Sequence, residues 1–286
     1  MLLSTQTDYL TRHLGLEEGV RVLCEAGFDA LDFSMFSLAR EDNPINTEGV
    51  KYLEKMKKVA DSYGVVFNQA HAPFPSIREG DEEYNKRMFK AIVRSMEVCN
   101  YLGIGIVVVH PTHFSNKEDR KTLNQDFYNQ LIPYCEKYNV KVALENMWGY
   151  NNELKKIVPN VCSTGEELAE YVDALDSKYF TVCLDLGHCA LVGEDAASMI
   201  RVLGHDRVKA LHVHDVDGVN DCHTAPFFEK LDWNSITKAL ADIEYSGDLT
   251  FEADSIYLRK PIELLPATAK FLHDIGRVLI RMIEKA

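Results

Sequence analysis

The sequence lacks the features that mark secreted and membrane proteins. Its seven cysteines are odd in number and form no C-x-x-C pair, so a disulfide framework is not indicated. No apolar run approaches the roughly 18 residues that a membrane span requires. The first ten residues, MLLSTQTDYL, contain neither a basic segment nor a long apolar one, unlike a secretory signal. We therefore expect a cytoplasmic protein without a membrane partner, whose cysteines are reduced and mostly buried.

Basic charge is also scarce in this chain. The 286 residues carry 31 Lys and Arg against 44 Asp and Glu, a net charge of −13 with neutral histidines. Non-specific binding of nucleic acid depends on clustered Lys and Arg, so a nucleic-acid partner is not expected. The hydrophobic fraction of 46% and the charged fraction of 26% are ordinary for a folded globular protein.

Short apolar runs rich in β-formers alternate with longer amphipathic stretches along the whole chain. One helical pattern covers Glu82–Leu102, where Met88, Ile92 and Met96 recur at intervals of four residues. A last helical stretch, Ile262–Glu284, follows the eighth apolar run. The eight predicted strands are Leu2–Ser4, Ala30–Phe33, Val65–Ala70, Gly105–Val109, Val140–Leu144, Phe180–Leu184, Val208–Val213 and Asp248–Phe251.

Eight strand–helix units without a dividing linker predict an α/β fold, a (β/α)8 TIM barrel with a C-terminal helical extension. We expect residues 1–286 to form this one domain. The alternative is an open, doubly wound sheet, which usually carries a G-x-G-x-x-G turn after its first strand. The corresponding segment here is TQTDYLTRHLG, which lacks those glycines. The barrel is therefore favoured.

Ionisable side chains end or follow six consecutive predicted strands. The carboxyl-terminal strand ends of a barrel meet at one face, and that face holds the active site. A single histidine or carboxylate is usually a core residue or a helix cap, but six strand ends together indicate a functional site. The residues are His71 in QAHAPF, His110 in VVVHPTH, Glu145 in VALEN, Asp185 and His188 in CLDLGH, His212 and His214 in LHVHD, and Glu252 in TFEAD.

Carboxylates packed at a barrel mouth require positive charge, because burying an unpaired charge is costly. A divalent cation supplies it, and we expect Glu145, Asp185, His212 and Glu252 to be its ligands. His212 is preferred to His214 because it lies earlier on its strand, level with the other three residues. Carboxylate and imidazole ligands without thiolate suit Mn²⁺, Co²⁺ or Zn²⁺, whereas an all-oxygen site would indicate Mg²⁺ or Ca²⁺.

The order of the motifs HAPF, HP-x-H, LEN, D-x-x-H, HVHD, D-x-H and FE resembles the xylose isomerase-like barrel superfamily. This group includes sugar and sugar-phosphate isomerases and epimerases, ketose 3-epimerases and endonuclease IV. The motifs extend from His71 to Glu252, and their combined order is more specific than any one of them. The resemblance implies a divalent-metal-dependent sugar or sugar-phosphate isomerase or epimerase with a small-molecule substrate.

In ketose 3-epimerases, the residues that match Glu145, Asp185, His212 and Glu252 bind one Mn²⁺ or Co²⁺. The resemblance therefore implies one divalent ion, Mn²⁺ first, with Co²⁺, Mg²⁺ and Zn²⁺ as alternatives. It also implies that Glu145 and Glu252 act as catalytic acid and base and that His188 holds the substrate. An arginine that some of these epimerases place after strand seven has no counterpart in HDVDGVNDCH, which leaves the substrate contacts open.

The expected reaction is proton transfer next to a carbonyl, through an enediolate that the metal stabilises as a Lewis acid. An epimerase needs two carboxylates, one to remove the proton and one to return a proton to the opposite face, whereas a 1,2-isomerase can use one. A keto-sugar lyase or dehydratase would share the enediolate. The sugar, its phosphorylation and assembly into a homo-oligomer are left open. The expected substrate-binding residues are His71, His110, His188, Trp148 and His223.

The alternative within the same superfamily is a three-zinc phosphodiesterase similar to endonuclease IV. The sugar hypothesis is preferred because Phe74 replaces a tyrosine of the nuclease and the net charge is unsuited to duplex DNA. A non-catalytic binding barrel would have lost ligands, and none is lost. Residue types that match the three-zinc ligands are present at His71, His110, Glu145, Asp185, His188, His212, Asp221, His223 and Glu252.

Overall fold

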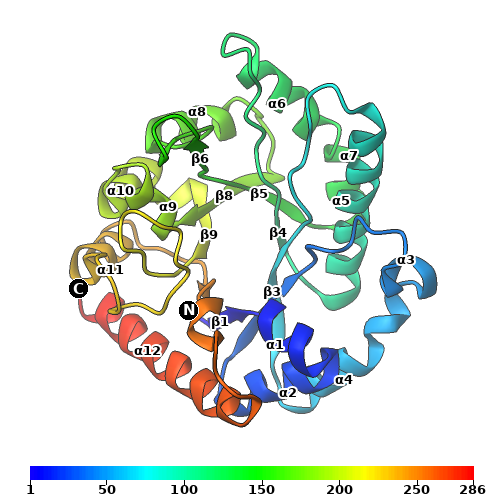
Figure 1. The fold of residues 1–286 in the computed structure, drawn as a ribbon, viewed down its shortest axis with the longest axis vertical. Coiled ribbons are helices and arrows are strands. Elements are labelled where there is room, and N and C mark those ends of the chain that lie inside the picture. The colour runs from blue at the N-terminus through cyan, green and yellow to red at the C-terminus, as the bar shows by residue number, and fades with distance from the viewer.

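The computed structural model describes all 286 residues and contains the predicted eight-stranded parallel barrel (Figure 1). The strands are hydrogen-bonded in the order β10-β1-β2-β3-β4-β5-β8-β9. Val213 and Phe251 form a parallel bridge that joins β9 to β10, so the ring closes. The strands are β1 Leu3–Gln6, β2 Ala30–Ser34, β3 Val66–His71, β4 Ile106–Val108, β5 Lys141–Glu145, β8 Phe180–Asp185, β9 Val208–His212 and β10 Leu249–Phe251.

Helices surround the barrel as an outer ring (Figure 1). The predicted C-terminal helical extension begins as the short 3-10 helix η3 and continues as the long helix α12. None of the helices combines the length and the apolar character needed to cross a membrane. The α-helices are α1 Asp8–Leu14, α2 Leu16–Ala26, α3 Pro44–Glu48, α4 Glu54–Ser62, α5 Glu82–Leu102, α6 Arg120–Asn129, α7 Ile132–Tyr138, α8 Gly165–Asp173, α9 Leu186–Leu191, α10 Ala196–Arg207, α11 Trp233–Asp242 and α12 Leu265–Lys285. The 3-10 helices are η1 Val50–Leu53, η2 Asp254–Tyr257 and η3 Ile262–Leu264.

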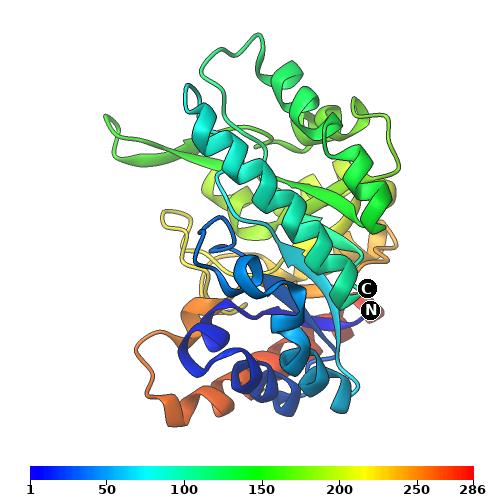
Figure 2. The ribbon, with the colours of Figure 1, turned by 90° about the vertical axis from the view of Figure 1, so that its right-hand side faces the viewer.

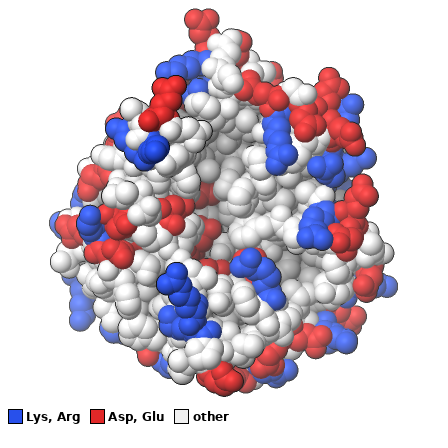
Figure 3. All heavy atoms as spheres, viewed as in Figure 1, with Lys and Arg blue, Asp and Glu red and all other residues white.

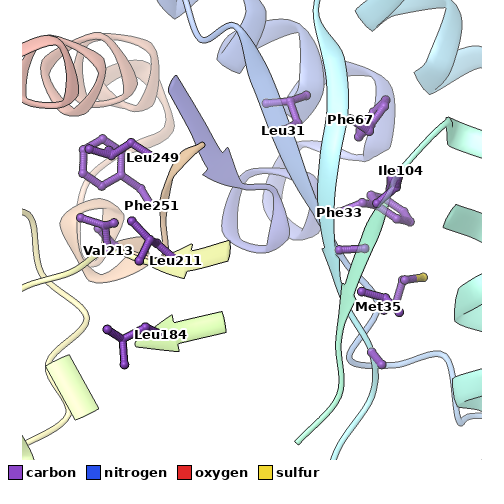
Figure 4. Packing of buried hydrophobic residues seen from close by; sticks show 14 of the residues in the cluster. Leu31, Phe33, Met35, Phe67, Ile104, Leu184, Leu211, Val213, Leu249 and Phe251 are labelled. Carbon is purple, nitrogen blue, oxygen red and sulfur yellow. The ribbon is translucent and has the colours of Figure 1, made fainter. Parts of the chain in front are cut away.

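The hydrophobic core has two layers because alternate residues of a strand point to opposite faces. The larger layer lies between strands and helices, where Figure 4 shows Leu211 and Val213 beside Leu249 and Phe251. The smaller layer contains one residue from each of four strands: Val108, Ala143, Cys183 and Ala210. Glu145, Asp185 and His212 lie two residues beyond Ala143, Cys183 and Ala210 on the same strands and therefore point to the same face as these residues.

One pair of strands lies outside the barrel and is not among the strands predicted from the sequence. Strands β6 (Trp148–Asn151) and β7 (Lys156–Pro159) form an antiparallel hairpin after β5. Figure 2 shows this hairpin extending away from the barrel at the end where the strand-end residues gather. Each strand has only four residues, and their mixture of Trp, Gly, Tyr, Asn and Lys gives little hydrophobic periodicity.

Candidate active site

The four predicted cation ligands come together at the carboxyl-terminal ends of the barrel strands. Glu145, Asp185 and His212 are the last residues of β5, β8 and β9, and Glu252 directly follows β10. One ligand atom from each lies within 4.8 Å of the other three. We call these residues the quartet. Its geometry suits one divalent ion, and the binding of that ion stays a prediction.

His212 occupies the centre of the quartet. Its Nδ1 lies 3.0 Å from Glu145 Oε1, 3.0 Å from Glu252 Oε2 and 3.9 Å from Asp185 Oδ2. On the other side of the ring, Nε2 faces the buried Asp32 Oδ2 at 3.8 Å. The imidazole therefore presents one nitrogen to the carboxylates and directs the other into the barrel.

A second group of donors shares Glu145 with the quartet. His110 Nε2 lies 2.9 Å from Glu145 Oε2 and 2.9 Å from His71 Nε2, and His71 Nε2 lies 3.6 Å from the same Glu145 oxygen. The two rings are nearly perpendicular, with an interplanar angle of 84°. Three potential ligand atoms thus converge on a point beside the quartet.

A third group gathers on the opposite flank, around two aspartates. Asp221 Oδ2 lies 3.1 Å from His223 Nε2 and 3.5 Å from His188 Nε2. His214 Nε2 lies 2.9 Å from Asp185 Oδ1, and the His214 ring stacks on that of His223 with centroids 4.2 Å apart. His214, which is not one of the predicted ligands, therefore contacts a quartet member from outside.

The orientation of three histidines favours a cation over plain hydrogen bonding. The Nδ1 atoms of His71, His188 and His223 lie 2.7, 2.8 and 2.9 Å from the carbonyl oxygens of Ala72, Asn146 and Glu252. A carbonyl only accepts, so each Nδ1 carries a proton. Each Nε2 faces a carboxylate, either with a second proton or with a lone pair that can bind a cation. Metal-bound histidines are oriented in the same way, by donation from the distal nitrogen to a carbonyl or carboxylate.

The electrostatics of the cluster also require positive charge. Burial alone would raise the pKa of Glu145, but His212 and other imidazoles hold that pKa well below its ordinary value. Burial opposes protonation of His188, yet Asp185 and Asp221 raise the pKa of this imidazole to about 10. Protonated imidazoles therefore balance the carboxylates in the protein alone. A divalent cation can replace those protons on the same donor atoms.

Two sequence motifs hold this geometry from outside the ligand set. In LEN, the Asn146 amide accepts from Asp185 N at 2.8 Å and donates to Asp185 O at 2.9 Å, which ties the ends of β5 and β8 together. In D-L-G-H, Asp185 Oδ1 caps α9 by accepting from His188 N at 2.7 Å. A Cβ on Gly187 would lie 2.1 Å from His214 Cε1, so glycine permits this contact. Sequence patterns do not indicate these roles of Asn146 and Gly187, although both residues lie within the motifs.

A cavity of about 420 Å³ opens above the cluster. Figure 3 shows a hollow at the centre of this face, with acidic atoms visible inside it. All five predicted substrate-binding residues line the cavity, and so do Glu145 and Glu252, whereas Asp185 and His212 do not. No Lys or Arg lines it. Lining residues that the sequence does not single out as site residues are Pro75, Ser76, Ile77, Pro111, Thr112, His113, Met147 and Asn160.

Aromatic side chains form two parts of the cavity wall. Phe74 is 47% exposed, and its ring lies 4.8 Å from that of His110 with an interplanar angle of 30°. Trp148, the first residue of the hairpin, donates from Nε1 to Asp221 Oδ2 at 3.0 Å. The hairpin therefore places an aromatic ring beside the third donor group.

Comparisons with known proteins agree with this architecture. The chain matches the family model described as xylose isomerase-like TIM barrel over residues 20–275. It is 26% identical to the uncharacterized protein MJ1311 of Methanocaldococcus jannaschii, over 84% of this chain and 80% of that protein. It is 29% identical to probable endonuclease 4 of Acholeplasma laidlawii, over 62% of this chain and 57% of that protein. Identity to fructoselysine 3-epimerase of Escherichia coli O157:H7 is 19%, over 87% and 90% of the two chains.

Solved structures have the same fold. A D-tagatose 3-epimerase-like protein superposes with a TM-score of 0.77 at 22% identity and covers 100% of this chain and 99% of its own. The IolI protein, whose structure contains a binding zinc atom, gives a TM-score of 0.70 at 18% identity, with 100% and 99% coverage. At these identities the likeness establishes the barrel and its extent.

Proposed function

Because the chain belongs to the xylose isomerase-like TIM barrel family, we propose that it is a metal-dependent sugar isomerase or epimerase. The observation that carries this proposal is the quartet Glu145, Asp185, His212 and Glu252, buried beneath a cavity of about 420 Å³. A cavity of this volume is in the range that accommodates a small molecule. Sugar epimerases among the relatives and structural neighbours support the same substrate class.

The quartet would hold the divalent ion, with Mn²⁺ as the expected metal and Co²⁺, Mg²⁺ or Zn²⁺ as alternatives. The position of His212 Nδ1 among the three quartet carboxylates supports this assignment, since a cation there would balance their charge. When bound, the ion supplies Lewis-acid stabilisation of the negative charge that develops on the substrate oxygen. Asp185 and His212 do not line the cavity, so they would serve to hold the ion rather than to contact the substrate.

Glu145 and Glu252 are the expected acid and base. Each has a carboxylate oxygen 3.0 Å from His212 Nδ1, and both line the cavity. One carboxylate removes the proton from the carbon next to the carbonyl, and an enediolate forms. The other returns a proton to the opposite face and inverts the carbon, which is the reaction of an epimerase. If a single carboxylate performs both transfers, the outcome is a 1,2-isomerisation.

The remaining cavity residues suit a sugar. His71, His110, His188 and His223 offer ring nitrogens to hydroxyl groups, and Trp148 and Phe74 offer apolar surface to the carbon–hydrogen face of a sugar. The cavity is lined by no Lys or Arg, which supports a substrate without a phosphate group.

Solvent exchange tests this proposal even where the product is unidentified. The metal-free protein is loaded with Mn²⁺ and incubated in D₂O with pentuloses and hexuloses, and NMR records deuterium at the carbon next to the carbonyl. We expect exchange with at least one ketose and a loss of about 10³-fold or more in the Glu145→Gln variant, because the base is absent. Glu170→Gln, on the exposed part of α8, serves as the matched control and should keep the wild-type rate.

Exchange that survives both Glu145→Gln and Glu252→Gln would remove the two carboxylates from the mechanism. Product analysis by ¹³C NMR separates the related reactions. A new stereocentre indicates an epimerase, an aldose indicates an isomerase, and loss of water or chain cleavage indicates a dehydratase or lyase.

A second candidate function rests on the two donor groups that flank the quartet. His71, His110 and Glu145 form one, and His188, His214, Asp221 and His223 form the other. Three neighbouring groups support a three-metal phosphodiesterase, and the relative named probable endonuclease 4 favours the same alternative. Metal analysis and cleavage of a duplex with an abasic site distinguish the candidates. One ion per chain and no cleavage favour the sugar enzyme, whereas three ions and cleavage favour the nuclease.

A further inference from the structure

The segment that follows β4 at the cavity rim is held in place by two buried polar side chains of α6. The Asn124 amide accepts from Thr112 N at 2.8 Å and donates to Thr112 O at 2.9 Å. Arg120 Nε donates to Phe114 O at 3.0 Å. Arg120 is only 9% exposed, and its guanidinium bonds to a carbonyl and an imidazole rather than to a carboxylate. Glu167 interacts with the charge of Arg120 only at longer range than an ion pair. A buried arginine without a direct ion pair is costly, so its position indicates a role beyond fixing one carbonyl.

The same arginine determines the tautomer of a cavity residue. Arg120 Nη2 lies 3.2 Å from His113 Nε2. A guanidinium can only donate, so Nε2 of His113 accepts and its ring proton resides on Nδ1. Partial desolvation of this exposed ring and the charge of Arg120 lower the pKa of His113, which favours the neutral form. His113 therefore offers an N–H donor for which the protein supplies no acceptor.

Thr112 and His113 both line the cavity but belong to none of the three donor groups. The Thr112 hydroxyl, like the His113 Nδ1–H, has no partner in the protein, although the backbone of Thr112 is fixed on both sides. Two fixed polar groups without partners at the wall of a cavity are suited to bind a ligand. Neither carries a full charge, and Arg120, which contacts His113 from behind, does not line the cavity, so the two groups suit a hydroxyl or ether oxygen better than a phosphate.

We propose that Thr112 and His113 are specificity residues that bind an uncharged oxygen of the substrate, and that Arg120 is a positioning residue that presents His113 in its Nδ1–H form. This inference rests on the proposed sugar function and narrows its substrate class to unphosphorylated ketoses. The quartet performs the chemistry on one part of the sugar. Thr112 and His113 select among sugars by binding another part.

The test compares KM with kcat in metal-loaded variants, using the ketoses found active by exchange and their 1-phosphates. Thr112→Val and His113→Phe each remove one hydrogen bond, so KM should rise about three- to tenfold while kcat and metal content stay near wild type. Thr112→Ser and His113→Gln keep a neutral donor and should restore much of the affinity. Ser115→Ala is the matched control, because Ser115 lies in the same segment but bonds to Glu79 and does not line the cavity.

The role of Arg120 in fixing the His113 tautomer is tested by a measurement that a purely structural role would leave unchanged. In Arg120→Met, the ¹⁵N shifts of the His113 ring should move away from the Nδ1–H form, and KM should rise as in His113→Phe. A melting temperature near wild type shows that the segment is still folded. If the variant unfolds, Arg120→Lys supplies the comparison, because lysine keeps the charge and loses the planar fork.

Each result decides the proposal. An unchanged KM in His113→Phe and Thr112→Val, a fall in kcat alone, or a wild-type preference for the 1-phosphate would overturn it while leaving the sugar function intact. If no ketose binds or exchanges and the abasic duplex is cleaved, the sugar function fails and this inference fails with it.

Discussion

The two ends of the barrel bury polar groups in opposite ways. At the amino-terminal end, Ser4 Oγ donates to Asn68 Oδ1 at 2.8 Å, and Asn68 Nδ2 donates to Asp248 Oδ2 at 3.0 Å. Asp248 Oδ1 accepts from Leu2 N at 2.9 Å. Each donor in this chain of hydrogen bonds meets an acceptor. At the carboxyl-terminal end, carboxylates and imidazole lone pairs face one another and need a proton or a cation between them.

This difference separates stability from function within one fold. The Ser4, Asn68 and Asp248 side chains at the amino-terminal end satisfy one another, as expected where the barrel needs only to be stable. The carboxyl-terminal end places hydrogen-bond acceptors, carboxylates and imidazole lone pairs, next to one another. This arrangement lowers the stability of the protein when no cation is bound. In this barrel, buried polar side chains that lack a complementary hydrogen-bond partner therefore indicate the functional end.

Two neighbouring aspartates show the same contrast at closer range. Asp185 faces His188, His212 and His214, whereas Asp215 accepts from three backbone N–H groups and one indole. Asp215 is fully buried, and its donors are Val216 N, Glu229 N, Leu231 N and Trp233 Nε1, at 2.9 to 3.1 Å. We infer that Asp215 fixes the loop between β9 and α11 and needs no cation.

The largest effect on stability is expected at Asp215. Asp215→Ala leaves four donors without an acceptor, two of them buried and two partly buried, so the free energy of unfolding should fall by about 3 kcal/mol. Urea denaturation monitored by tryptophan fluorescence measures this change. Asp217→Ala is the matched control, because Asp217 lies in the same loop but is only half-buried and bonds to Val219 and Asn220 at the surface, so its effect should be smaller. An equal loss in both variants would show that Asp215 is not the anchor.

The sequence allowed the barrel and the quartet to be predicted because both follow from local patterns. Alternation of apolar runs and amphipathic stretches gives strands and helices, and period-two register places Glu145 and Asp185 on one face. Contacts between distant segments could not be predicted in this way. Arg120 orients His113 only because α6 packs beside the β4 segment, and Trp148 meets Asp221 across 73 residues. The sequence pattern does not predict the hairpin β6–β7 because its strands are short and weakly apolar.

The next largest effect is the pH dependence of the stability that the histidines at the carboxyl-terminal end contribute. Burial opposes protonation of His212, yet the carboxylates of Glu252 and Glu145 raise its pKa well above its ordinary value, and the pKa of His188 rises to about 10. The folded protein without metal therefore holds protons that the unfolded chain has lost at neutral pH. The contribution of these protonated histidines to the free energy of unfolding has its full value below about pH 6.5. It is lost as the pH rises through about 10.

Metal binding must release these protons, so the affinity for Mn²⁺ should rise with pH by about tenfold per unit for each proton displaced. Calorimetric titration at pH 6, 7 and 8, in buffers of different ionisation enthalpy, measures both the affinity and the protons released. The melting temperature of the loaded protein should also exceed that of the metal-free protein by more at pH 9 than at pH 6. An affinity that is independent of pH would show that the imidazoles are neutral before the metal binds.

The smallest effect is expected at the amino-terminal end, where Asn68→Ala removes hydrogen bonds to Ser4 and Asp248. Because the site is only partly buried, water can replace some of the lost contacts, and the free energy of unfolding should fall by about 1 kcal/mol. Affinity for Mn²⁺ and KM should stay at wild-type values, since the substitution touches neither the quartet nor the cavity. A matched fall in metal affinity would show that the two ends are energetically coupled, and the division of the barrel into a stabilising end and a functional end would then be wrong.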